Sequence, residues 1–230
     1  MSALRPFITG LALLLSTMTL VACGGGSAST DSSGLAIPPH NIVSTVDDAT
    51  GDATSSAGVA WDISRVQTTL VEGPFKDEYL TLQVAVSFTQ DVSTALPNPG
   101  QPLRGYPDRL GVQILLNIDG SANTGAPGYA CSQNATIPGV DAVVDAGGYA
   151  GRHADGSYTI LDSKGVAHDV APVSVSGHVI TYTIDLAAWG APATGIQKTN
   201  ISVIAFNGAG QDGVETDCAP NAGPMSVSGT

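Results

Sequence analysis

Apolar and polar residues alternate in short stretches along most of the chain. The clearest stretch runs from residue 80 to 88, where Leu, Val and Phe alternate with Thr, Gln, Ala and Ser. Residues 111–119 and 139–146 follow the same period of two, which is typical of a β-strand that turns one face to a core. Further strands are expected at 59–63, 66–71, 158–161, 173–175, 178–186, 200–206 and 225–227.

Turn signals separate these stretches. Asp155-Gly156 and Ser176-Gly177 each stand between two apolar runs, as the turn of a β-hairpin does. Helical periodicity is nearly absent, apart from one helical turn expected at 186–189 with Asp185 as its cap. About eight to ten short strands joined by such turns predict an all-β fold, an antiparallel β-sandwich of the jelly-roll kind.

The N-terminal segment is apolar from residue 7 to residue 20, a run too short to span a membrane and typical of a secretory signal. Leu20-Val21-Ala22-Cys23 resembles the lipobox of bacterial lipoproteins, in which signal peptidase II cuts before the cysteine and its thiol carries diacylglycerol. The resemblance implies a signal peptide over 1–22 and lipidation of Cys23, which anchors such a chain in the bacterial cell envelope. An ordinary signal peptide that contains a cysteine is the alternative.

Position 24 is Gly rather than the Asp that favours inner-membrane retention in enterobacterial lipoproteins, which favours the outer membrane. Residues 23–39 are rich in Gly and Ser and are expected to form a flexible tether. Residues 40–230 have the length of a single domain. Without residues 1–22, seven basic residues (8 less Arg5) stand against 20 acidic ones, so the net charge is near −13. This charge argues against nucleic acid as a partner.

Two cysteines remain after Cys23, namely Cys131 and Cys218. In an oxidising exported compartment, such a pair most simply forms a disulfide, with free thiols as the alternative. A bridge between residues 131 and 218 would close a long loop, which the chain-entropy description rates at roughly 4–5 kcal/mol of stability.

Five short motifs occur in order over residues 48–228: Asp48-Ala-Thr-Gly51-Asp52, Trp61-Asp62-Ile63, Ile118 to Gly125, Gly139-Val-Asp141-Ala and Asp217 to Gly223. Their order resembles the secreted bacterial β-sandwich domains related to carbohydrate-binding module family 9 and the DOMON superfamily. The resemblance implies a sandwich that binds a ligand, with carbohydrate as the expected class. The chain departs from the family pattern at Gly120-Ser121, where a second acidic residue is usual, and at Ala142, where an aromatic residue is common.

Acidic and amide residues follow the two central predicted strands. Calcium takes six to eight oxygen ligands from carboxylates, carbonyls and waters. Asp119, Asn123 and Asp141, together with Asp52 or Asp48 from the N-terminal turn, are therefore the expected ligands of a calcium site. The alternative is that these are ordinary turn residues whose side chains bond to nearby backbone.

Aromatic residues supply the remaining candidates for a binding surface. Tyr106, Tyr129 and Tyr149 fall in loops or at strand ends, where a ring can stack on a sugar, whereas Trp61 and Trp189 are expected in the core.

Catalytic signatures are missing from the sequence. It contains neither Gly-x-Ser-x-Gly nor His-Glu-x-x-His, and its four histidines are dispersed. The glycines of 208–213 match the spacing of a dinucleotide-binding loop, but the residues after them are poor helix formers, which such a loop requires. The chain is therefore predicted not to be an enzyme.

The predicted function is a lipid-anchored, non-catalytic binding module, with carbohydrate as the expected ligand. The alternative is a structural or assembly lipoprotein that contacts another envelope protein. A haem-binding domain of the DOMON kind, with Met225 and a histidine as axial ligands, also stays open.

Overall fold

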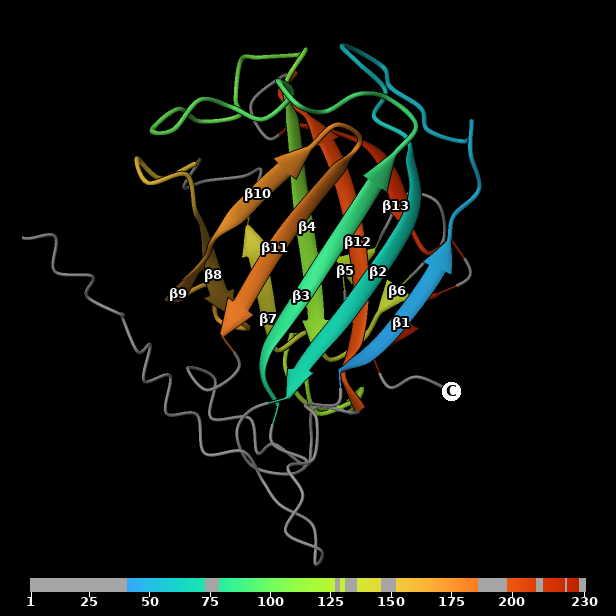
Figure 1. The fold of residues 1–230 in the computed structure, drawn as a ribbon, viewed down its shortest axis with the longest axis vertical. Helices are drawn as coiled ribbons and strands as arrows, with labels where there is room; N and C mark the ends of the chain where they lie inside the picture. Colours follow the sequence, from blue (N-terminus) through green and yellow to red (C-terminus); the bar gives the residue numbers. More distant parts are fainter. Residues whose placement is uncertain are drawn as a thin grey trace, which may run out of the picture.

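The computed structural model of the chain describes residues 41–72, 79–126, 129–130, 136–145, 152–185, 198–209, 213–221 and 223–227. Two antiparallel sheets are stacked face to face (Figure 1), so the predicted all-β sandwich is confirmed. The described strands are β1 (Ile42–Asp47), β2 (Ile63–Glu72), β3 (Tyr79–Phe88), β4 (Leu110–Asn117), β5 (Tyr129–Ala130), β6 (Thr136–Ile137), β7 (Ala142–Asp145), β8 (Tyr158–Asp162), β9 (Ala167–Ala171), β10 (Val173–Ser176), β11 (Val179–Asp185), β12 (Asn200–Asn207), β13 (Val214–Ala219) and β14 (Met225–Ser226).

The first sheet has the order β1-β2-β3-β11-β10 and the second the order β13-β12-β4-β7-β8-β9, with β14 also paired to β12. β5 and β6 form a separate two-stranded sheet. The described residues thus form 14 strands rather than eight to ten. Five of these strands were not predicted, namely β1, β5, β6, β9 and β13. β5 and β6 are only two residues long, and β9 lacks an apolar run, so hydropathy alone does not mark these three. β1 and β13 have six residues each and were missed.

The main core lies between the sheets and is formed by apolar side chains at alternate positions of the strands. In β3, Leu82, Val84 and Val86 are fully buried, and Ile180 and Tyr182 of β11 are buried against the same core. The two strands pair in register, with Tyr182 opposite Val84. Their alternation was the strongest strand signal in the sequence, and the structure confirms it.

Strand β4 departs from the predicted half-buried pattern because both of its faces are covered. Ile114 and Leu116 face the main core, whereas Leu115 packs in a second, smaller cluster on the other face of the sheet. Its other members are Ile137, Val140, Val143, Ile204 and Cys218. The sequence of a central strand that is buried on both faces is a nearly continuous apolar run.

The segment 59–62 is loop, not strand as predicted. Its backbone bonds leave the sheet, because Val59 N–H donates to Pro107 O (3.0 Å) and Asp62 N–H donates to the side-chain oxygen of Gln90 (3.2 Å). Trp61 is nevertheless buried in the main core, as predicted.

Several predicted features lie outside the described residues. They are the signal peptide over 1–22, Cys23, the tether, the helical turn at 186–189 and Trp189. Within the described part of the chain, no helix has the length and apolar character needed to cross a membrane.

Two buried tyrosines yield a stability prediction. The ring centroids of Tyr158 and Tyr182 lie 6.1 Å apart in the core, and both hydroxyl groups are buried with no hydrogen-bond partner among the described residues. Removing an unsatisfied buried polar group is neutral or stabilising, so Tyr182→Phe should leave the unfolding free energy unchanged or raise it by up to about 1 kcal/mol. Urea unfolding of both proteins checks this, and a loss above about 1 kcal/mol would show that the hydroxyl is bonded.

Candidate functional site

The predicted acidic loop after β4 is held together by its own hydrogen bonds. Asp141 Oδ2 accepts from Ile118 N–H (2.8 Å) and from Asp119 N–H (3.4 Å), so Asp119 and Asp141 lie together as predicted. Asp119 in turn accepts from Ser121 N–H (2.7 Å) and from the Thr124 hydroxyl (2.8 Å). Protein donors therefore already bond both carboxylates, as in ordinary turns made by Asp side chains.

Two further residues complete this loop. Asn117 is buried, and its amide donates to Ser121 O (3.2 Å) and Pro138 O (2.9 Å), which closes the loop against the entry to β7. Asn123 is exposed and contributes its backbone N–H to Ser121 Oγ (3.3 Å). Burial raises the pKa of Asp141, and the two backbone bonds oppose that rise.

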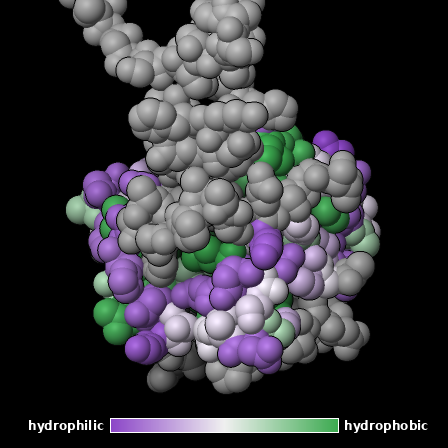
Figure 2. Space-filling view, turned by 90° about the horizontal axis from the view of Figure 1, so that it is seen from below, coloured by the Kyte–Doolittle hydropathy of each residue, from purple (hydrophilic) through white to green (hydrophobic). Residues whose placement is uncertain are grey.

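The end of the sandwich that carries this loop is seen from below in Figure 2. Hydrophilic residues make up much of its described surface, with separate hydrophobic areas between them. A mixed surface of this kind is ordinary for an exposed protein face.

A second acidic group lies elsewhere in the fold. Asp48, Asp52 and Asp217 each place a carboxylate oxygen within 4.8 Å of the others. In Figure 1, β1 runs upward and β4 runs downward. Asp48 and Asp52 follow the end of β1, and Asp119 follows the end of β4. The two acidic regions therefore sit at opposite ends of the sandwich, and the structure does not bring Asp52 together with the other predicted calcium ligands.

Strand register supports this separation. Asp217 pairs with Ala205, which pairs with Val112. Val112 precedes Asn117, the last residue of β4, by five residues, or roughly 17 Å at about 3.3 Å per residue, and Asp119 lies beyond that end.

Asp217 is the buried centre of the second acidic group. It has no exposed surface, and its two oxygens accept from Ile63 N–H (2.6 Å) and Cys218 N–H (2.7 Å). The first bond joins β13 to the start of β2, in the opposite sheet. Asp217 thus fixes the loop 48–62 against the end of the sandwich.

Asn221 connects the other two carboxylates. Its backbone N–H donates to Asp48 Oδ1 (3.1 Å), and its side-chain amide donates to Asp52 Oδ2 (2.6 Å). Asp62 bonds to the same turn, because its carboxylate accepts from Gly51 N–H (3.0 Å) and also from the Thr89 hydroxyl (3.0 Å). Four acidic side chains therefore gather around one short turn.

The titration of this group is strongly perturbed. Burial raises the pKa of Asp217 to about 7, and the charges of Asp48 and Asp52 add to the rise. Burial likewise raises the pKa of Asp48 to about 6, with further contributions from Asp52 and Asp62. The neighbouring charges that act on both carboxyls are thus negative.

Comparison of the sequence with known proteins gives no function for this acidic group. No family model and no curated protein matches the sequence. Function is therefore inferred from the residues.

Sequence reasoning missed Asp217 as a site residue, although a signal was present. Three of the five matched motifs, 48–52, 61–63 and 217–223, meet at this group. Their convergence depends on packing between residues more than 150 positions apart, which a motif list does not reveal.

The predicted tyrosines are only partly described. Tyr106 is 40% exposed, whereas Tyr149 and the side chain of Tyr129 lie outside the described residues. Cys218 is buried, and Cys131 also lies outside the described part, so their disulfide stays a prediction.

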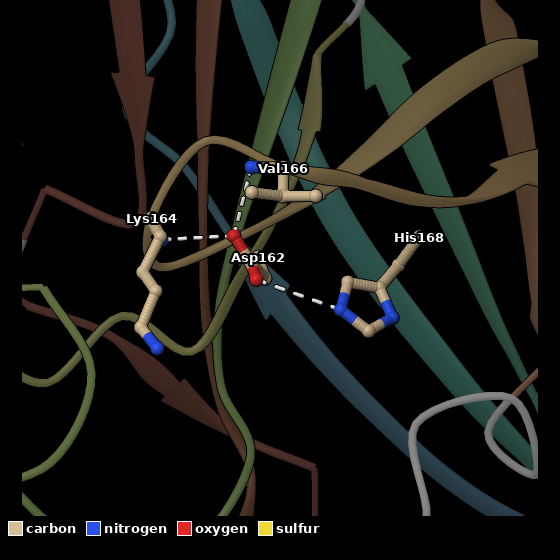
Figure 3. A network of polar contacts seen from close by, with 4 residues as sticks. All are labelled: Asp162, Lys164, Val166 and His168. Atoms are coloured by element: carbon tan, nitrogen blue, oxygen red, sulfur yellow. Dashed lines mark hydrogen bonds and ion pairs between the residues drawn. The ribbon is translucent and has the colours of Figure 1, made fainter.

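The described histidines lie in turns and strand ends. His168 Nε2 stands 3.5 Å from Asp162 Oδ2 at the surface (Figure 3), and His153 bonds to the Thr159 hydroxyl (2.8 Å). Asp162 also accepts from the backbone N–H groups of Lys164 and Val166, and these bonds lower its pKa, the Val166 bond most. The two backbone bonds to Asp162 span the turn between β8 and β9, so this network closes that turn.

Proposed function

We propose that this chain is an exported bacterial lipoprotein that displays a non-catalytic, carbohydrate-binding β-sandwich. Cleavage before Cys23 and lipidation of its thiol would anchor the chain, with the outer membrane favoured, and residues 23–39 would hold the domain away from the bilayer. The order of the five motifs, which resembles carbohydrate-binding module family 9 and the DOMON superfamily, supports carbohydrate as the ligand class.

The observation that carries the proposal is the exposed Tyr106, on a loop that is hydrogen-bonded to the segment after β12. Gly105 N–H donates to Gly208 O (2.8 Å), and Gly208 N–H donates to Tyr106 O (3.2 Å). A Cβ at Gly208 would overlap the carbonyl oxygen of Leu103, so the two segments approach each other as closely as glycine allows. An aromatic ring held in place before binding loses little conformational entropy when it stacks on a ligand.

Retention on insoluble polysaccharides tests the proposal. The full chain should bind at least one polymer without shortening it, and Tyr106→Ala should weaken that binding about tenfold, the loss of roughly 1.4 kcal/mol typical of an aromatic contact. Tyr106→Phe keeps the ring and serves as the matched control. Failure to bind any polymer, or equal binding by Tyr106→Ala, would contradict the carbohydrate assignment.

A second role, as an assembly lipoprotein that contacts another envelope protein, is favoured by the edge strand β9. This strand ends the seven-stranded sheet, and two large apolar side chains beside or within it, Val166 and Val170, are exposed. An exposed edge of this kind can accept a strand from a partner. Crosslinking in cells from position 170 should then trap one protein reproducibly.

A further inference from the structure

Two side-chain oxygens at the acidic group of Asp48, Asp52 and Asp217 have no hydrogen-bond partner among the residues that the structure describes. They are Asp48 Oδ2 and Asn221 Oδ1, and both atoms are buried from solvent. A buried acceptor without a donor destabilises the folded chain. The two residues that carry these oxygens are joined by the hydrogen bond from Asn221 N–H to Asp48 Oδ1.

The negative charge of this group also indicates that a ligand is needed. Asp217 is completely buried, yet its two oxygens accept from neutral backbone N–H groups. Asp48 and Asp52 lie within 4.8 Å, and the Asp62 charge also acts on Asp48. Buried carboxylates need a compensating positive charge, and two unsatisfied oxygen acceptors need a group that attracts lone pairs. A cation meets both requirements at once.

We propose that Asp48, Asp52, Asp217 and Asn221 bind one divalent cation, and that this cation is calcium. The available ligands are carboxylate and amide oxygens from two loops and one strand. Calcium accepts six to eight such oxygens with flexible geometry, whereas magnesium requires a near-ideal octahedron and retains waters.

Zinc fits this donor set less well, because it prefers Cys and His ligands. Cys218, the residue after Asp217, packs in the second apolar cluster with Leu115 and Val143, on the far face of the sheet. The cation would tie the turn after β1 to the loop after β13, at the opposite end of the sandwich from Asp119 and Asp141.

Thermal unfolding of the full chain, stripped with EDTA and then titrated with calcium chloride, tests the site. At a calcium concentration about 100 times Kd, the melting temperature should rise by roughly 5–10 °C. Asp48→Asn should abolish this rise. Its metal-free melting temperature should not fall, because the variant removes one of several mutually repelling charges and its new amide can donate to the remaining carboxylates.

Two further variants keep the outcome decisive. Asp217→Asn should also lose the calcium response, and it replaces Asp48→Asn if that variant does not fold. Asp119→Asn, in the rival acidic loop, should keep the full response. The site is wrong if calcium leaves the wild-type melting temperature unchanged, or if the response survives Asp48→Asn and disappears in Asp119→Asn. An equal response to magnesium would overturn the assignment to calcium.

Discussion

Replacing Gly139 with alanine should destabilise the chain by roughly 3 kcal/mol or more, the range of substitutions that force a backbone clash. Gly139 has φ +69°, and a Cβ there would overlap the carbonyl oxygen of Ser121 and press on the Asn117 amide at 3.0 Å. Both groups belong to the loop that Asn117 closes, so neither can move without breaking its hydrogen bonds. Urea unfolding measures the loss.

Gly165 provides the matched control for this prediction. It also has positive φ, at +76°, but an added Cβ would meet nothing within 4 Å. Gly165→Ala should therefore cost only the backbone strain of a left-handed residue, about 1 kcal/mol. Equal losses in the two variants would mean that the loop after β4 is not packed against the entry to β7 as described.

The metal-free chain should become less stable as the pH rises from about 4 to about 7. Burial raises the pKa of Asp217 to about 7 and that of Asp48 to about 6, whereas an unfolded aspartate titrates near 3.9. The folded chain therefore holds more protons than the unfolded chain in this range, and stability falls as those protons leave. The raised pKa of Asp141 acts in the same direction.

The size of this effect follows from the shift at Asp217. A pKa difference of one corresponds to about 1.4 kcal/mol, and solvent screening reduces the contribution of the more exposed Asp48, so we expect a loss of about 2 kcal/mol between pH 5 and pH 8. Urea unfolding with EDTA at the two pH values measures it. Asp217→Asn should flatten the profile. A wild-type stability that rises over this range would contradict the buried, charged cluster.

Local patterning was enough to predict most of the sandwich. In β3 and β11 one face is buried and the other is not, so the alternation of apolar and polar residues is visible in the sequence. β4 was placed correctly, but its second buried face also depends on Ile204 and Cys218, which lie far along the chain. β13 follows a glycine-rich stretch and was not expected as a strand. Its presence rules out the helix that a dinucleotide-binding loop requires.

In the candidate site, too, one contact could be predicted from the sequence and another could not. The contact between Asp119 and Asp141 could be predicted, because adjacent strands bring their flanking turns together. The contact of Asp217 with Asp48 and Asp52 could not, because it requires β13 of one sheet to pack beside the start of β2 in the other. The segments 48–52, 61–63 and 217–223 form one group only because the fold brings them together.

Export is the premise shared by the lipid anchor, the predicted Cys131–Cys218 disulfide and a carbohydrate ligand outside the cell. The mass of the protein purified from bacterial membranes tests it most directly. The account predicts a chain that begins at Cys23 and carries diacylglycerol, with a Cys23→Ala variant that lacks the lipid mass. A chain that retains residues 1–22, or one that is cut elsewhere and carries no lipid, would contradict it.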